Sequence, residues 1–335
     1  MNTNLQLETE RLTRSWMQYD ESLLGGYLVA GVEDPRTNLQ SLLTRNYLIT
    51  ALFGSKYSEL LDQEFRFALA MNWLLKLLPP TGDEDDLATV RHALEHRCDN
   101  AEDIPIPVLI QDTYAALPVQ LNGIQLPNYI EEFLTTTPPA TGMTPPILGT
   151  FERLWNGLLA SEPRQIVSLL EPACGSANDY RSFDSFGLAP FLDYSGFDLC
   201  EKNVINARAL FPEIRFETGN AFAIQAADKQ FDHCIVHDLF EHLSIEGMET
   251  AVSEICRVTK RGICASFFQM DETPEHLVRP VDDYHWNKLS MARTKALFEP
   301  HASAVRVVHL DTLARLEFNL GTTHNPDAYT FTVSL

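Results

Sequence analysis

The sequence has few basic residues and no long apolar run. Its 335 residues include 25 Lys and Arg against 46 Asp and Glu, which gives a formal net charge of −21. A chain this acidic repels phosphate backbones, so we expect no nucleic-acid partner. No apolar stretch is long enough to cross a membrane, and the polar residues 1–10 do not form a signal peptide. We therefore expect a cytoplasmic protein with no membrane partner.

The sequence also lacks paired cysteines. None of its six cysteines is spaced as C-x-x-C, and several lie in apolar runs. This arrangement favours buried reduced thiols over zinc ligands or disulfides. His237 and His242 have an H-x-x-x-x-H spacing that permits zinc binding, but no third ligand has a suitable spacing. We predict no metal site.

A short apolar run at residues 166–170 is followed by an acid and a turn of small residues. The run is too short for a helix and is apolar on both faces, as in a buried parallel strand. Glu171 would then lie at the carboxyl end of the strand, where open α/β sheets bind ligands. The small residues of the turn 173–177 allow the backbone to approach a ligand closely. We expect Asn178 and Asp179 to cap the helix that follows.

A second strand is predicted over residues 193–199. It ends in Asp198, which lies 27 residues after Glu171, a spacing that fits one strand–helix–strand unit. A carboxylate at this position can accept hydrogen bonds from both hydroxyls of a ribose. It can also cap the next helix, and both interpretations remain open. A third strand at residues 214–216 follows.

The fourth apolar strand, residues 231–237, begins with Phe-Asp and precedes the segment Phe-Glu-His-Leu at 240–243. Taken in this order, these motifs resemble a class I (Rossmann-like) S-adenosylmethionine-dependent methyltransferase over roughly the last 170 residues. The family's first loop reads E/D-x-G-x-G-x-G. Here only the middle glycine is present, as Gly175, because Ala173 and Ala177 replace the outer two.

The resemblance implies an α/β fold with a Rossmann-like seven-stranded methyltransferase sheet that is mostly parallel. Alternating stretches at 305–310 and 329–335 would supply the antiparallel C-terminal strand. We expect the methyltransferase domain to span residues 151–335. Residues 1–150 are expected to form a mainly helical cap or dimerisation region with a proline-rich connector, which allows a homodimer. The first 35 residues either fold over the cofactor or pack on the surface.

The resemblance also implies that S-adenosylmethionine is the cofactor. The expected cofactor-binding residues follow the first four strands and are Glu171, Ala173, Cys174, Gly175, Asn178, Asp198, Leu199, Asn220, Ala221, Phe222, His237 and Asp238. Asn220 stands where the family usually has an aspartate, and its amide oxygen can still accept a hydrogen bond from the adenine amino group. Phe222 either stacks beside the adenine or fills the core.

The implied reaction is methyl transfer to a small-molecule acceptor, for which the protein supplies proximity and alignment. A general base is needed only when the acceptor must lose a proton. His242 and His237 are the candidate catalytic bases, because neutral imidazole accepts a proton near pH 7. The insertion after the fifth strand carries Tyr284, His285 and Trp286. We expect these three residues to contact the substrate, although loop packing explains them equally well.

Two other functions fit parts of the sequence. An NAD(P)-dependent oxidoreductase shares the strand–loop–helix unit and the ribose acid, but the missing outer glycines, the Phe-Asp strand and the terminal hairpin oppose it. A non-catalytic adenosylmethionine-binding protein, with a regulatory or assembly role, is compatible with the altered glycine pattern and with Asn220.

Overall fold

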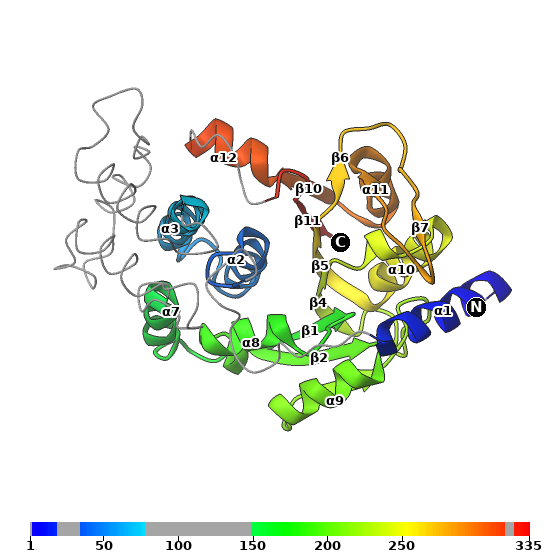
Figure 1. Cartoon of the computed structure of the whole chain (residues 1–335). Helices are drawn as coiled ribbons and strands as arrows, with labels where there is room; N and C mark the ends of the chain where they lie inside the picture. Colours follow the sequence, from blue (N-terminus) through cyan, green and yellow to red (C-terminus); the bar gives the residue numbers. More distant parts are fainter. Residues whose placement is uncertain (1, 19–33, 78–148, 319–324) are drawn as a thin grey trace.

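A seven-stranded sheet forms the centre of the molecule. The computed structural model describes residues 2–18, 34–77, 149–318 and 325–335 (Figure 1). The strands of the sheet are β1 (Val167–Pro172), β2 (Leu192–Asp198), β3 (Arg215–Thr218), β4 (Phe231–His237), β5 (Thr259–Phe267), β10 (Ala304–His309) and β11 (Tyr329–Ser334). Their order is β10-β11-β5-β4-β1-β2-β3.

The first five strands run parallel, and only the C-terminal strand reverses direction. β1 pairs in parallel with both β2 and β4, whereas β11 is antiparallel to β5 and β10. Most residues of β1 and β4 are buried, which explains the apolar runs at the centre of both strands. The predicted fold class, a mostly parallel Rossmann-like methyltransferase sheet with an antiparallel C-terminal strand, is confirmed.

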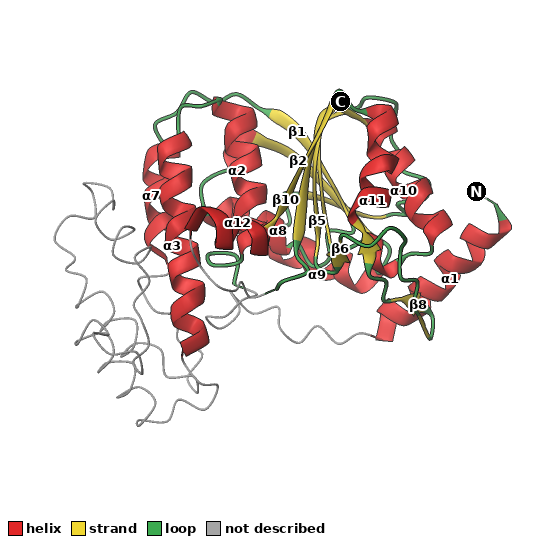
Figure 2. Cartoon of the chain, turned by 90° about the horizontal axis from the view of Figure 1, so that it is seen from above, coloured by secondary structure: helices red, strands yellow, loops and turns green. Residues whose placement is uncertain are grey.

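Helices cover both faces of the sheet (Figure 2). The described helices are α1 (Thr3–Gln18), α2 (Leu39–Phe53), α3 (Ser58–Leu77), α7 (Thr150–Leu159), α8 (Asn178–Ser185), α9 (Glu201–Leu210), α10 (Ile245–Val258), α11 (Met291–Phe298) and α12 (Leu310–Phe318). Helices α2, α3 and α7 lie on one side of the sheet, and α1, α10 and α11 lie on the other.

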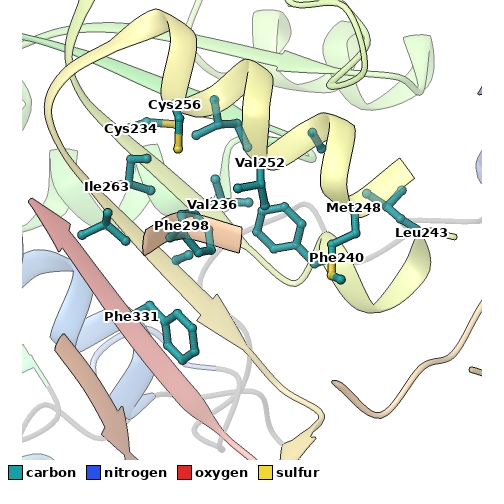
Figure 3. Packing of buried hydrophobic residues seen from close by; sticks show 14 of the residues in the cluster. Cys234, Val236, Phe240, Leu243, Met248, Val252, Cys256, Ile263, Phe298 and Phe331 are labelled. Atoms are coloured by element: carbon teal, nitrogen blue, oxygen red, sulfur yellow. The ribbon is translucent and has the colours of Figure 1, made fainter. Parts of the chain in front are cut away.

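One core lies between α10 and strands β4 and β5. Met248 and Val252 of α10 are at most 1% exposed and belong to the same buried cluster as Val236 and Ile263 of the strands (Figure 3). Ser244 accepts a hydrogen bond from the backbone N–H of Gly247 and so caps α10. This packing fixes the segment between β4 and α10, which reaches the site described below.

The second core draws residues from the N-terminal 150 positions into the sheet domain. Buried residues of α2 and α3 pack with α7, α8 and the sheet. Arg45 of α2 forms an ion pair of 2.9 Å with Glu64 of α3, and both side chains are at most 1% exposed. The described helices of the expected cap region therefore share the core of the sheet domain. The proline-rich connector and Cys98 lie outside the described residues, so the division at residue 150 stays a prediction.

The start of α8 differs from the sequence expectation. Neither Asn178 nor Asp179 caps the helix: both are helical residues, and the N-cap is Ala177, which makes no side-chain cap hydrogen bond. Asp179 instead forms an ion pair with a histidine of β4. The capping prediction was wrong because local spacing does not reveal a partner 58 residues away.

The two alanines that replace the family's outer glycines adopt the conformation that glycine favours. Ala173 has φ 57°, Gly175 has φ 52° and Ala177 has φ 70°. An L-residue in this left-handed region costs about 1–2 kcal/mol. The turn has therefore kept the backbone geometry of a three-glycine loop without two of its glycines.

Replacing Ala173 with glycine should stabilise the protein. Relief of the left-handed strain exceeds the extra backbone entropy that glycine loses on folding, which is about 0.5–1 kcal/mol. We expect the free energy of unfolding to rise by up to about 1 kcal/mol in urea titration. The matched control is Ala160→Gly, because Ala160 is exposed and has φ −57°. That variant should lose stability; a loss in both variants would contradict the strain argument.

Candidate functional site

A cavity of about 230 Å³ lies at the carboxyl ends of strands β1 to β4. Its lining residues come from the four loops after these strands, from α1 and from the segment before α10. They are Leu12, Ala173, Gly175, Phe197, Asp198, Leu199, Asn203, Gly219, Asn220, Ala221, Phe222, His237, Asp238, Leu239, His242 and Leu243. This position is where open α/β sheets bind their ligands.

The loop after β1 is fastened to the end of β2. The backbone N–H of Cys174 donates to the carbonyl of Phe197 at 3.0 Å, and that of Gly175 donates to Oδ2 of Asp198 at 2.9 Å. A Cβ atom added to Gly175 would meet no other atom within 4 Å. Gly175 therefore leaves the cavity open where its backbone lines it.

Asp198 organises the end of β2. In addition to the Gly175 contact, its Oδ1 accepts from the backbone N–H of Cys200 at 2.8 Å and from Asn203 Nδ2 at 3.3 Å. The side chain lines the cavity although the residue is only 8% exposed. The carboxylate binds the backbone at the start of α9 and also lines the cavity, so ribose binding by Asp198 stays a prediction.

Helix α1 forms one wall of the cavity. Leu12 lines it, and Thr9 Oγ1 accepts from Asn220 Nδ2 at 2.9 Å. Glu8 accepts from the backbone N–H and the hydroxyl of Ser244 at 2.6 and 2.5 Å, which attaches α1 to the start of α10. The sequence left open whether the N-terminal residues cover the site or pack on the surface, and Leu12 lies in the site.

Nine of the twelve expected cofactor-binding residues line this cavity, as do both expected bases. The other three do not. Cys174 is buried, Asn178 is exposed, and Glu171 is buried where its Oε2 accepts a hydrogen bond from the Tyr194 hydroxyl at 2.5 Å. Their contact with a cofactor stays a prediction. Sequence reasoning did not include six further lining residues, which carry no distinctive motif: Leu12, Phe197, Asn203, Gly219, Leu239 and Leu243.

His237 uses both ring nitrogens within the protein. Nδ1 lies 2.9 Å from Asp179 Oδ2, and Nε2 lies 2.6 Å from Thr44 Oγ1. Burial alone would lower the pKa of His237, but the carboxylate of Asp179 outweighs it and raises the pKa. Both ring nitrogens are engaged by protein groups, so the geometry disfavours His237 as a base for a substrate.

His242 is arranged differently. Its Nδ1 lies 3.2 Å from the backbone carbonyl of His285, which makes Nδ1 the protonated nitrogen and Nε2 the acceptor in the neutral ring. Burial lowers the pKa of His242, and its hydrogen bond to that carbonyl opposes the shift only in part. A neutral imidazole in the cavity wall is suited to accept a proton near pH 7.

The three expected substrate residues gather around His242. The ring centroid of His242 lies 5.8 Å from that of Tyr284, 5.4 Å from that of Trp286 and 5.5 Å from that of Phe268. His285 contributes its carbonyl to the same histidine. Trp286 remains 38% exposed. The insertion after β5 thus supplies an aromatic wall beside the cavity.

Glu241, which precedes His242, is a buried acid. Oε1 accepts from the backbone N–H of Phe268 at 2.8 Å, whereas Oε2 has no hydrogen-bond partner in the described part of the chain. Burial, together with the nearby charge of Asp238, raises the pKa of Glu241 to about 8. The side chain is therefore protonated at neutral pH.

Glu241→Gln should remove a pH dependence of stability. The pKa of the folded state exceeds the unfolded value, so between pH 4.5 and 8 only the folded state keeps the proton. Stability of the wild type should then fall with rising pH by at most about 1.4 kcal/mol per unit from this residue. The advantage of the variant over wild type should grow across that range in urea titrations. Glu249→Gln, an exposed control on α10, should show no such trend; parallel curves for wild type and Glu241→Gln would contradict the protonated acid.

A comparison with protein-family models covers the strands that build this cavity. Residues 170–265, from β1 into β5, match the family model described as a methyltransferase domain. The match spans less than a third of the chain but includes the loops after β1, β2, β3 and β4. A search of curated proteins finds no match.

Several solved methyltransferase structures are similar to the chain. One from Methanosarcina mazei is 12% identical, covers 53% of this chain and 96% of its own, and has a TM-score of 0.39. One from Mesorhizobium loti is 14% identical and covers 54% and 97%, also with a TM-score of 0.39. The 1,6-didemethyltoxoflavin-N1-methyltransferase of Burkholderia thailandensis, with its substrate and S-adenosylhomocysteine bound, is 13% identical and covers 55% and 78%, with a TM-score of 0.37.

The methyltransferase-domain match supports S-adenosylmethionine as the cofactor, and the residues present fit it. The cofactor is a cation that carries a ribose. The described cavity lining contains the carboxylates of Asp198 and Asp238 but no Lys or Arg. Gly175 leaves open space, and Asp198 can serve the ribose hydroxyls.

Within the described ranges, no three His, Cys, Asp or Glu side chains are grouped to hold a metal ion. The five described cysteines are buried and form no disulfide with one another. None of the helices in the described segments is long and apolar enough to cross a membrane.

Proposed function

We propose that the protein transfers a methyl group from S-adenosylmethionine to a small aromatic acceptor that carries a hydroxyl. The observation that carries this proposal is the position of His242. It lines the cavity of the methyltransferase domain and packs among Phe268, Tyr284 and Trp286. A neutral base beside an aromatic wall suits a planar ring with a proton to lose.

Each part of the site has a role in this reaction. When bound, S-adenosylmethionine supplies a methyl group activated by its sulfonium sulfur. Asp198 holds the ribose hydroxyls, and the small residues of the loop 173–175 leave room for the cofactor. Asp238 adds a negative charge at the end of β4, which favours a cationic ligand. Nε2 of His242 accepts the proton of the acceptor hydroxyl, and Trp286 orients the acceptor ring.

The two alternatives receive less support. A dinucleotide brings a pyrophosphate, which the carboxylates of the described lining would repel without any basic side chain to compensate. A binder without catalysis needs no base, yet a neutral histidine lies in the cavity wall. The sequence interpretation as an oxidoreductase or a regulatory protein is therefore secondary to methyl transfer.

Labelled cofactor tests the acceptor class. Wild-type protein is incubated with methyl-labelled S-adenosylmethionine and matched panels of aromatic hydroxyl compounds, aliphatic alcohols and amines. We expect label only in the first panel. Labelling of amines or alcohols alone would overturn the acceptor class, and cofactor binding without any labelled product would favour the non-catalytic binder.

Trp286→Ala should raise the acceptor KM at least about fivefold. The loss of a stacking wall costs about 1–3 kcal/mol of acceptor binding. The matched control is Leu277→Ala, because Leu277 lies in the same insertion and is 65% exposed. An unchanged KM in Trp286→Ala would remove the acceptor from the aromatic wall.

A further inference from the structure

His237 links three elements that meet beneath the cofactor cavity. It ends β4, contacts Asp179 in the first turn of α8, and contacts Thr44 in the middle of α2. The turn 173–177, which lines the cavity through Ala173 and Gly175, leads directly into α8. An interaction that restrains Asp179 therefore also restrains the end of this turn.

His237 has a hydrogen-bond partner at each ring nitrogen. Nδ1 donates to the carboxylate of Asp179 at 2.9 Å. Nε2 lies 2.6 Å from Oγ1 of Thr44, whose hydroxyl can donate either to Nε2 or to the backbone carbonyl of Gln40 at 3.1 Å. The negative charge of Asp179 favours the imidazolium form of the ring. A charge-assisted pair with Asp179 is roughly twice as strong as a neutral hydrogen bond.

The first part of this turn is fastened to β2 through Cys174 and Gly175, but the end that leads into α8 has two unfavourable features. Two of its residues are alanines in the left-handed region, and α8 begins without a side-chain cap. Asp179, which could have capped the helix, is used for the ion pair instead. The ion pair between His237 of β4 and Asp179, which we call the anchor, thus offsets the strain of the two alanines and the missing cap.

We propose that His237 is a positioning residue that fixes the cofactor-binding turn through Asp179 and connects this turn to α2 through Thr44. The cofactor identity rests on the proposed function; the positioning role does not. In this account His237 determines the affinity for cofactor, whereas His242 acts on the acceptor. The N-terminal helix α2 thereby contributes to cofactor binding without contacting the cofactor.

The surroundings of His237 define how the anchor responds to pH. In the described part of the chain, the charged and titratable groups that face His237 or its partner Asp179 are Asp238, Glu171, Arg45, Cys174, Tyr194 and Cys264. The pKa of His237 is raised above its ordinary 6.5. The ion pair with Asp179 is therefore present below the raised pKa and is lost as pH rises through it. Cofactor affinity should decline over that interval.

The test compares His237→Gln and Thr44→Val with wild type and with the exposed control His301→Gln. Affinity for S-adenosylmethionine is measured by calorimetry from pH 6 to 9, and kcat is measured at saturating cofactor. We expect His237→Gln to bind at least tenfold more weakly, with kcat within threefold of wild type and with no decline in affinity that follows the His237 pKa. Thr44→Val keeps the side-chain shape and should weaken binding in the same direction.

Hydrogen exchange of the protein without cofactor separates this inference from the proposed function. Amides of residues 174–181 should exchange faster in both variants than in wild type, whether or not the chain binds S-adenosylmethionine. Unchanged exchange there would overturn the positioning role. So would wild-type affinity in His237→Gln, or a loss of kcat with affinity retained, which would make His237 a group that acts on the acceptor. If wild type fails to bind the cofactor, the proposed function fails and the exchange data alone decide.

Discussion

Asp198→Asn should weaken binding of S-adenosylmethionine by at least 100-fold. The carboxylate accepts from the backbone N–H groups of Gly175 and Cys200 through different oxygens. An amide has only one acceptor atom, so its NH₂ group must face one of these two donors. The substitution therefore displaces the cavity loop and removes the negative charge that would accept the ribose hydroxyls. Two lost charge-assisted hydrogen bonds at about 1.5–3 kcal/mol each give a loss of this size.

A matched variant on the same strand distinguishes a loss of cofactor binding from a loss of folding. Asp193 lies on β2 but is exposed, and Asp193→Asn should bind the cofactor as wild type does. Calorimetry gives both affinities, and thermal unfolding shows whether Asp198→Asn still folds. Wild-type affinity in a folded Asp198→Asn protein would mean that the cavity does not hold the ribose.

His242→Asn should lower kcat by about 10²–10⁴-fold, the usual contribution of a general base. The asparagine amide can replace the Nδ1 hydrogen bond to the carbonyl of His285, so the loop keeps its support. What disappears is the Nε2 acceptor. Cofactor affinity should change much less than kcat, because the altered group faces the acceptor.

The pH dependence of kcat/KM also tests His242 as the base. A base must be unprotonated to act, so wild-type kcat/KM should rise with pH and level off above the pKa of His242. Burial lowers this pKa below 6.5, which places the inflection below pH 6.5. The remaining activity of His242→Asn should lack this inflection. A variant within threefold of wild type, with the same profile, would exclude His242 as the base.

The strands of the sheet could be predicted from the sequence because their patterns are local. The short apolar run of β1 indicates a buried strand, the Phe-Asp start and the apolar centre mark β4, and alternation marks β10 and β11. Asp198 could also be placed, since a strand end and a 27-residue spacing are local properties. These features depend on period and length, which a single sequence displays.

The anchors of the site could not be predicted because they join residues far apart in the chain. Asp179 has the composition of a helix cap, and only the proximity of His237 gives it another partner. Leu12 reaches the cavity because Glu8 binds Ser244, 236 residues away. Glu171 follows the family motif, yet its partner Tyr194 comes from the neighbouring strand. Tertiary packing determines these contacts, and a local sequence pattern cannot predict them.

The measurement that tests this account most directly is calorimetric titration of the full chain with S-adenosylmethionine, S-adenosylhomocysteine and NAD(P). We predict saturable binding of the two adenosyl compounds, no binding of NAD(P), and loss of both adenosyl signals in Asp198→Asn. Binding of NAD(P) alone would contradict a methyltransferase site and favour the oxidoreductase. Binding of none of the three would mean that the cavity at the strand ends does not take this cofactor.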